Sequence, residues 1–121
     1  MKFAKIVFWG AGIWGVLSLT PLYFIFDAIG RQDPPAITHP GFYYGFAGVA
    51  LAWQFAFFVI ARDPLRFRLM MIPSVLEKLG FGIPAIVLYT QRRIGAFDLT
   101  LGCVDLLLGA LFLVAFGATA A

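Results

Sequence analysis

Four long apolar stretches follow one another along the chain, and short polar segments separate them. Windows poor in charged residues fall at about residues 6–26, 41–61, 69–91 and 96–118. Each window is close to the roughly 20 apolar residues that an α-helix needs to cross the hydrocarbon core of a membrane. The pattern therefore predicts four transmembrane helices.

The apolar stretches lack the alternation of apolar and polar residues that is typical of strands in a membrane β-barrel. Segments such as "LAWQFAFFVIA" and "LLLGALFLVAFGA" are apolar at almost every position. Helices and closed barrels are the two structures that satisfy the backbone hydrogen bonds of a segment within lipid. The predicted fold class is therefore all-α, an integral membrane antiparallel four-helix bundle.

The polar segments predict how the helices are connected. The first, "DAIGRQDPPAITHP", contains charged residues and three prolines, so we expect an irregular backbone outside the hydrocarbon. The second, "RDPLRFR", and the third, "QRR", are short enough to force tight antiparallel hairpins. Residues 1–121 are then expected to form a single transmembrane domain.

The composition supports a membrane protein. Of the 121 residues, 62% are hydrophobic and 12% are charged, whereas soluble domains contain about 45–50% apolar and about 25% charged residues. The net charge is +3, but the basic residues lie mostly beside the apolar stretches. We interpret them as topology signals and predict membrane lipids, not nucleic acid, as their surroundings.

Basic residues are more numerous on one side of the predicted bundle than on the other. The first side carries Lys2, Lys5, Arg62, Arg66 and Arg68, and the second side carries Arg31, Arg92 and Arg93. Because cytoplasmic loops of membrane proteins carry an excess of lysine and arginine, we predict that both termini are cytoplasmic.

Small residues indicate faces along which the helices meet, because close backbone approach favours helix association in lipid. Ala11 and Gly15 form such a pair in the first helix, and Gly41 and Gly45 form one in the second.

The segment "GAGIWG" at residues 10–15 also matches the dinucleotide-binding pattern G-x-G-x-x-G, which requires a preceding strand and a βαβ unit. Inside a membrane helix we interpret it as a packing surface, and we predict no cofactor.

Glu77 and Lys78 stand side by side near the middle of the third predicted helix. Inserting a charged residue at that depth costs about 2.5–3.5 kcal/mol, so both side chains need partners. The helical face of Glu77 also carries Pro73, Gly80 and Pro84, which predicts that this face is turned toward the bundle interior. Lys78 points about 100° away, so we expect it to neutralise Glu77 poorly and to extend toward the cytoplasmic end.

The fourth predicted helix carries a stripe of acids and glycines. Asp98, Gly102, Asp105 and Gly109 follow one another at intervals of four, three and four residues. This spacing places them on one helical face, which we predict to be turned toward protein.

Glu77 and Asp105 are expected to approach one another across neighbouring helices. At about 1.5 Å per residue, they lie roughly 22 and 18 Å from the "QRR" turn that joins their helices. Two adjacent carboxylates in a low dielectric cannot both ionise easily, so one binds a proton or Lys78 pairs with one of them. We therefore predict a cluster of Glu77, Lys78 and Asp105 and include Asp98 among the candidate binding residues. The alternative is a buried ion pair that only sets the helix register, and no metal site is predicted.

The layout of residues 39–116 resembles that of a known class of membrane proteins. The stretch "HPGFYYGFAGVALAWQFAFFVIARDPLRFRLMMIPSVLEKLGFGIPAIVLY", together with "DLLLGALFLVAF", resembles small four-helix bacterial inner-membrane proteins of the DoxX-like kind. The resemblance implies a four-helix fold in a bacterial inner membrane and leaves the activity open. The chain is also similar in length to small multidrug-resistance transporters, but these carry an essential glutamate in the first helix, and residues 6–26 contain none.

The sequence leaves three functions open. The first is a non-enzymatic membrane protein, either an accessory subunit of a larger complex or a binder of a small apolar or cationic molecule. The second is a proton-coupled transporter that acts as a homodimer, since a mid-membrane acid can exchange a proton for substrate. The third is an enzyme acting on a lipid-phase substrate, with Glu77 or Asp105 as general acid or base and Lys78 stabilising charge.

Overall fold

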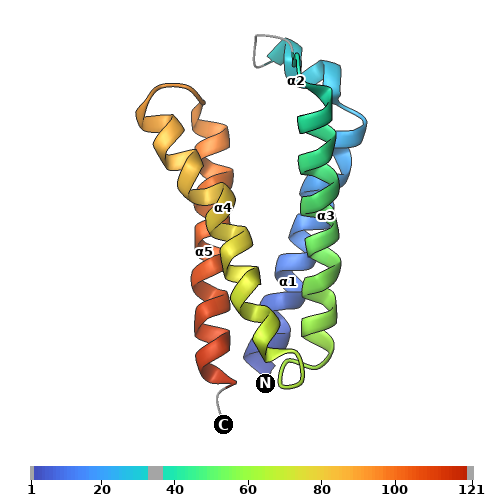
Figure 1. The fold of residues 1–121 in the computed structure, drawn as a ribbon, viewed down its shortest axis with the longest axis vertical. Helices are drawn as coiled ribbons and strands as arrows, with labels where there is room; N and C mark the ends of the chain where they lie inside the picture. Colours follow the sequence, from blue (N-terminus) through green and yellow to red (C-terminus); the bar gives the residue numbers. More distant parts are fainter. Residues whose placement is uncertain (1, 33–36, 120–121) are drawn as a thin grey trace.

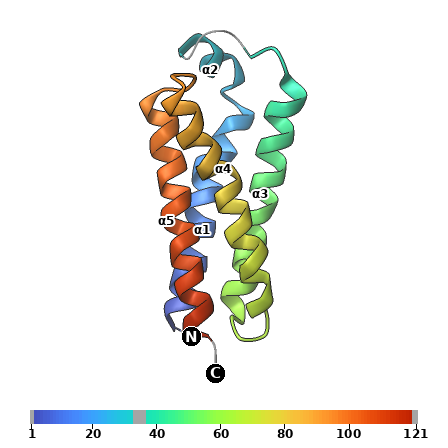
Figure 2. The same cartoon turned by 60° about the vertical axis from the view of Figure 1, so that its left-hand side comes forward.

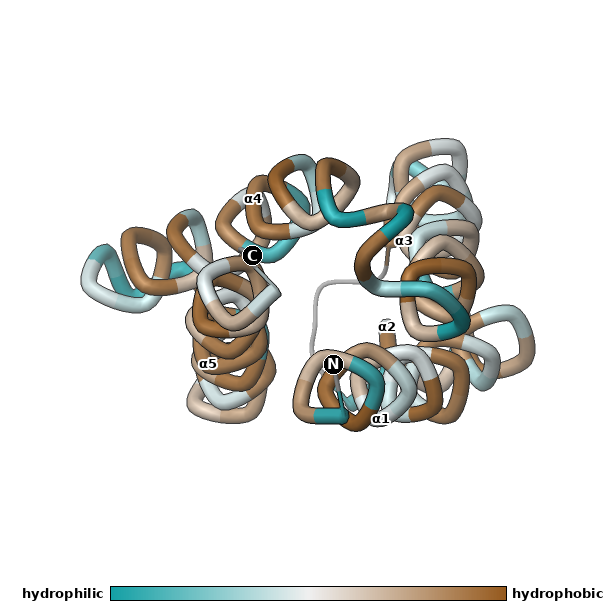
Figure 3. The backbone as a smooth tube through the Cα atoms, turned by 90° about the horizontal axis from the view of Figure 1, so that it is seen from below, coloured by the Kyte–Doolittle hydropathy of each residue, from teal (hydrophilic) through white to brown (hydrophobic). Residues whose placement is uncertain are grey.

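The computed structural model describes residues 2–32 and 37–119, and its long helices form two antiparallel pairs (Figure 1). One pair consists of α1 (Lys2–Leu19) and α3 (Pro40–Arg62), and the other of α4 (Met71–Thr90) and α5 (Ala96–Ala118). The helices follow the order α1, α3, α4, α5 around a ring that is largely hydrophobic (Figure 3). The predicted all-α four-helix bundle is confirmed.

Four segments are long and apolar enough to cross a membrane, as the apolar windows predict. They are Lys2–Tyr23, Pro40–Arg62, Arg68–Thr90 and Ala96–Ala118. The protein is therefore a small multi-pass membrane protein. The first of these segments begins before its predicted window and also ends before it. The early end is explained by Pro21, which lies in the 3₁₀ helix η1 (Thr20–Tyr23). Proline cannot donate the backbone hydrogen bond that a continuing α-helix needs.

The connection after η1 contains a short helix, α2 (Phe26–Gln32), where we predicted an irregular backbone. That prediction is wrong because Phe26 is anchored on α3. Its ring centroid lies 5.0 Å from that of Tyr43 and 5.5 Å from that of Tyr44. An acidic residue in the first turn and a basic residue in the last turn also suit the helix dipole. The prediction for residues 33–36 lies outside the described residues.

Three phenylalanines close the half of the bundle that contains both chain ends. Phe8, Phe57 and Phe112 come from α1, α3 and α5, and all are fully buried. The rings of Phe8 and Phe112 are stacked with centroids 4.2 Å apart, and Phe57 meets Phe112 edge-on at 5.0 Å. We call these three residues the aromatic core. Aromatic contacts of this kind add about 0.5–1.5 kcal/mol each beyond the effect of burial.

Arg68, in the 3₁₀ helix η2 (Arg68–Met70) before α4, binds the end of α5 in the same half of the bundle. Its Nε donates hydrogen bonds to the backbone oxygen of Phe116 at 3.1 Å and to Thr119 Oγ1 at 3.2 Å. Its guanidinium carbon also lies 3.6 Å from the centroid of the Phe116 ring. Arg68 thus satisfies a terminal carbonyl of α5 and places a positive charge at the negative end of the helix dipole.

The two helix pairs diverge toward the end that carries α2 (Figures 1 and 2). α3 and α4 contact each other over far fewer residues than the helices within either pair, and most of the contact between the pairs is made by α1 with α5. The bundle is therefore packed at the end of the chain termini and more open at the other.

Small residues position the helices of the α1–α3 pair, partly as predicted. Gly12 and Gly15 lie where an added side-chain carbon would collide with Phe58 and Gln54 of α3, so the packing role predicted for "GAGIWG" is confirmed at these two glycines. Gly41 and Gly45 do not pack against another helix of this bundle, because both are exposed and an added carbon at either would meet no described atom within 4 Å outside its own helix backbone. α3 instead packs through the face that carries its buried alanines.

Glycines also bring α4 and α5 close together. A side-chain carbon added at Gly102 would lie 2.5 Å from Ala85 Cβ, and one at Gly82 would lie 2.5 Å from Leu106 Cγ. Gly102 and Gly109 are buried, so their predicted inward orientation is confirmed. The small residues allow the backbones to approach closely, which is the usual basis of helix association in membranes.

We predict that Gly102→Ala destabilises the protein by about 1–3 kcal/mol, because the added methyl group meets a carbon attached directly to the α4 backbone. Gly10→Ala in α1 is the matched control, since an added carbon there meets nothing within 4 Å. Alanine favours a helix by about 1 kcal/mol over glycine, so the control is neutral or stabilising. Unfolding in detergent measures both, and equal stability of the two variants would contradict the predicted close approach.

Candidate binding site

A cavity of about 280 Å³ lies between the two helix pairs. Its apolar wall includes Trp14 of α1, Tyr43 and Phe46 of α3, and Phe81 of α4, while Ile29 of α2 also borders it. The rings of Phe46 and Phe81 approach each other across α3 and α4, with centroids 5.9 Å apart. The cavity therefore has aromatic side chains on several sides and a ring pair between the helices that contact each other least.

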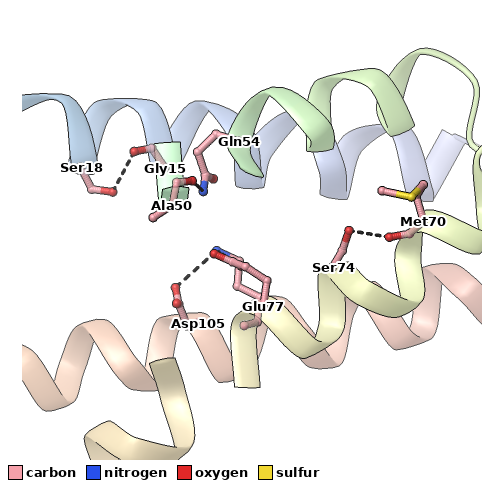
Figure 4. A network of polar contacts seen from close by, with 9 residues as sticks. Gly15, Ser18, Ala50, Gln54, Met70, Ser74, Glu77 and Asp105 are labelled. Carbon is pink, nitrogen blue, oxygen red and sulfur yellow. Dashed lines mark hydrogen bonds and ion pairs between the residues drawn. The ribbon is translucent and has the colours of Figure 1, made fainter. Parts of the chain in front are cut away.

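Ion pairs join three charged residues on one wall of this cavity. Lys78 Nζ donates a hydrogen bond to Asp105 Oδ1 at 3.5 Å and lies 3.6 Å from Glu77 Oε2. Glu77 and Asp105 lie on this wall, and Gln54 faces them from the other helix pair (Figure 4). We call Glu77, Lys78 and Asp105 the Lys78 cluster. Asp98, the fourth candidate residue, lies in the first turn of α5 and also lines the cavity.

Lys78 is oriented differently from the prediction. It is only 3% exposed, so it lies inside the bundle and does not extend to the cytoplasmic end. It also pairs with Glu77, although we expected the two adjacent side chains to be poorly placed to neutralise each other. Gly80 and Pro84, on the face predicted to turn inward, are exposed.

The reason is the packing of α4 on α5. Gly82 faces Leu106 and the backbone of Gly102, which turns the Lys78 side of α4 inward. Gly109 of α5 lies opposite Lys78, where a side-chain carbon would come within 3.3 Å of Lys78 Cβ. The small residue leaves room for the lysine stem, and the long flexible side chain can then reach both acids.

The Lys78 cluster lies between the cavity and the aromatic core. Lys78 Nζ is 5.2 Å from the centroid of the Phe57 ring, close enough for a cation–π attraction. Its partners Glu77 and Asp105 retain 16% and 18% exposure of their side chains. The ammonium group is thus the more deeply buried charge, and the carboxylates lie nearer to the open space.

The acidic groups around the cavity outnumber the basic ones. Three carboxylic acids and one lysine line it in the described part of the chain. Within the Lys78 cluster, ionisation of both Glu77 and Asp105 would leave one negative charge in excess in a region of low dielectric, which is costly. A proton or a bound cation would reduce that excess.

Gln54 is a site residue that our sequence analysis missed. It is 1% exposed, and its Nε2 donates a hydrogen bond to the backbone oxygen of Ala50, one turn earlier in α3, at 2.7 Å. Its Oε1 is buried against Gly15 and has no hydrogen-bond partner among the described residues. One signal in the sequence could have identified it, namely a single glutamine in the middle of an apolar span. A polar side chain at that depth needs partners from the protein, which indicates an orientation toward the bundle interior.

The chain has no significant match among protein-family models, curated proteins or solved structures. The resemblance to DoxX-like proteins therefore stays a prediction. The binding roles of Glu77, Lys78, Asp98 and Asp105 also stay predictions, and all four residues line the cavity.

We predict that Lys78 and Asp105 are energetically coupled. Lys78→Met and Asp105→Asn should each cost on the order of 3 kcal/mol, because each leaves a buried charged group with less compensation. The double variant should lose less stability than the sum of the single losses. Unfolding in detergent gives the three values, with the exposed Thr100→Val of α5 as a control near zero. Additive losses would contradict the coupling.

Proposed function

We propose that the protein binds a small organic cation with an apolar body within the membrane. The observation that carries this proposal is the cavity itself, because its walls are largely aromatic and aliphatic while its charged lining contains three acids and one lysine. A ligand that matches this lining needs a positive charge at one end and an apolar group at the other.

The charge of the ligand follows from the excess of acids. At an effective dielectric of 20, a cation about 4 Å from a carboxylate gains about 4 kcal/mol before its desolvation is counted. An anion at the same place would be repelled by the same groups. Lys78 offsets part of the negative charge, but it is shared between Glu77 and Asp105.

The apolar body of the ligand follows from the walls. Trp14, Phe46 and Phe81 line the cavity, and an aromatic face attracts a nearby cation by about 0.5–2 kcal/mol. The cavity of about 280 Å³ is slightly smaller than the roughly 300–1,000 Å³ of sites for drug-sized molecules. A single ring with a short charged arm is therefore a suitable size.

The direction of access follows from the packing. The aromatic core closes the half of the bundle that contains the chain ends, so the ligand would enter from the α2 end or between α3 and α4. Lys2, Lys5 and Arg62 are among the basic residues that support cytoplasmic termini. We propose that the cavity opens to the opposite side of a bacterial inner membrane.

We predict that the protein in lipid nanodiscs binds benzyltrimethylammonium and does not bind phenylmethanesulfonate, an anion of similar shape. Glu77→Gln and Asp105→Asn should each weaken binding of the cation about tenfold, which corresponds to about 1.4 kcal/mol. Ser74→Ala is the control, since Ser74 is buried on α4 outside the cavity lining.

Isothermal titration calorimetry against empty nanodiscs separates protein binding from partition into lipid. Binding of the sulfonate as tight as that of the cation would overturn the proposal. So would cation affinities that are the same in the wild type and in both carboxylate variants.

A second candidate, proton-coupled transport by a homodimer, is favoured by the divergence of the helix pairs at one end of the bundle. Transporters alternate between states that open to opposite sides by rocking one helix bundle against the other. Here two helix pairs meet tightly at one end and diverge at the other, which resembles one such state. The acids of the Lys78 cluster would then exchange a proton for the cation.

We predict for this candidate that an outward proton gradient drives uptake of benzyltrimethylammonium into proteoliposomes. Glu77→Gln and Asp105→Asn should both abolish the proton-driven component, and Ser74→Ala should retain it. Radiolabelled uptake with and without the gradient measures this component. Unaltered transport in both carboxylate variants would remove the candidate.

A further inference from the structure

Two buried acceptors in the lining of the cavity make no hydrogen bond within the described residues, and they belong to different helix pairs. Gln54 Oε1 of α3 and Glu77 Oε2 of α4 are buried and have no hydrogen-bond partner among the described residues. Both residues line the cavity, and their side chains lie on opposite sides of it (Figure 4). A buried acceptor without a donor costs about 1–3 kcal/mol, so Gln54 Oε1 calls for a ligand that donates a hydrogen bond, while Glu77 Oε2 is held only by its long ion pair with Lys78.

The geometry of Gln54 identifies its free atom as an acceptor. Its Nε2 donates to the Ala50 oxygen at 2.7 Å, which assigns the nitrogen and leaves Oε1 as the unpartnered atom. Gly15 leaves room for the Gln54 amide, because any side chain at position 15 would overlap it. The amide is therefore held by the α1–α3 pair and has one acceptor to offer.

The carboxylates of the Lys78 cluster also retain acceptor capacity. Their distances to Lys78 Nζ, 3.5 Å for Asp105 and 3.6 Å for Glu77, are longer than the roughly 2.7–2.9 Å of a strong charge-assisted hydrogen bond. A carboxylate can accept about four hydrogen bonds. A second ammonium group can thus bind these acids more closely than Lys78 does.

We infer that the ligand is a primary amine in its ammonium form, whose N–H groups donate to Gln54 Oε1 and to the carboxylates of the Lys78 cluster. This inference rests on the proposed function and specifies its ligand. A quaternary ammonium ion has the same charge and no N–H group, so it would leave Gln54 Oε1 unpartnered and would donate no hydrogen bond to the carboxylates. Sites that hydrogen-bond their ligand discriminate strongly against analogues that lack the donor.

Three ligands with one scaffold test the inference. Benzylammonium carries three N–H donors, N,N-dimethylbenzylammonium carries one, and benzyltrimethylammonium carries none. We expect the affinity of the wild-type protein to fall in that order, by about tenfold between the first and the last. Hydration alone predicts the opposite order, because a primary ammonium is the most costly of the three to remove from water.

Gln54→Met tests the contribution of the amide, because methionine has similar length and no strong acceptor. We expect the tenfold preference for benzylammonium to shrink to about twofold or less in this variant. The matched control is Ser74→Ala, which also removes a buried polar group that bonds back to its own helix, at 2.7 Å, but lies outside the cavity lining. It should keep the wild-type preference.

Isothermal titration calorimetry in nanodiscs distinguishes failure of the amine preference from failure of cation binding itself. Equal or tighter binding of benzyltrimethylammonium by the wild-type protein, with phenylmethanesulfonate still excluded, would overturn the inference and leave the proposed function standing. An undiminished preference in Gln54→Met would overturn the role of the amide. Failure of all three cations to bind would overturn the proposed function itself.

Discussion

A positive charge held inside a membrane protein must be compensated by groups of the same protein, and Lys78 meets this requirement. Its ammonium group is almost fully buried and is paired with Asp105 on α5 and Glu77 on α4. The pairing requires the inward face of α4 to be the one that carries Lys78. Glycines on both helices, among them Gly82 and Gly109, let the backbones approach so that the lysine can reach its partners. Charge compensation and close packing therefore depend on one another.

The Lys78 cluster also marks the boundary between two halves of the bundle. On one side the aromatic core joins α1, α3 and α5. On the other side the helix pairs diverge around the cavity. Lys78 contacts both halves, since its Nζ approaches the Phe57 ring and its acidic partners line the cavity. The packed half holds the helices in register, while the open half provides space beside charged groups.

The proposed ligand site draws on both helix pairs. Gln54 contributes an acceptor from the α1–α3 pair, and Glu77 and Asp105 contribute carboxylates from the α4–α5 pair. A cation that binds all of them would bridge two units that otherwise contact each other little along α3 and α4. Part of its binding energy would then stabilise the contact between the two pairs. Ligands that bind one state more tightly commonly shift a protein between open and closed states in this way.

The sequence alone determined the four helices and their antiparallel order, because the length and uniform hydrophobicity of each stretch leave a membrane-spanning chain few other structures. It also identified Glu77, Lys78, Asp98 and Asp105 as candidates, since charges among apolar residues are rare. It did not reveal which face of α4 turns inward or that Gly41 and Gly45 stay exposed. It also gave no sign that Gln54 would face the Lys78 cluster. Only the tertiary structure decided these points, because helix rotation depends on how side chains of several helices fit together, and one helix's periodicity cannot specify that fit.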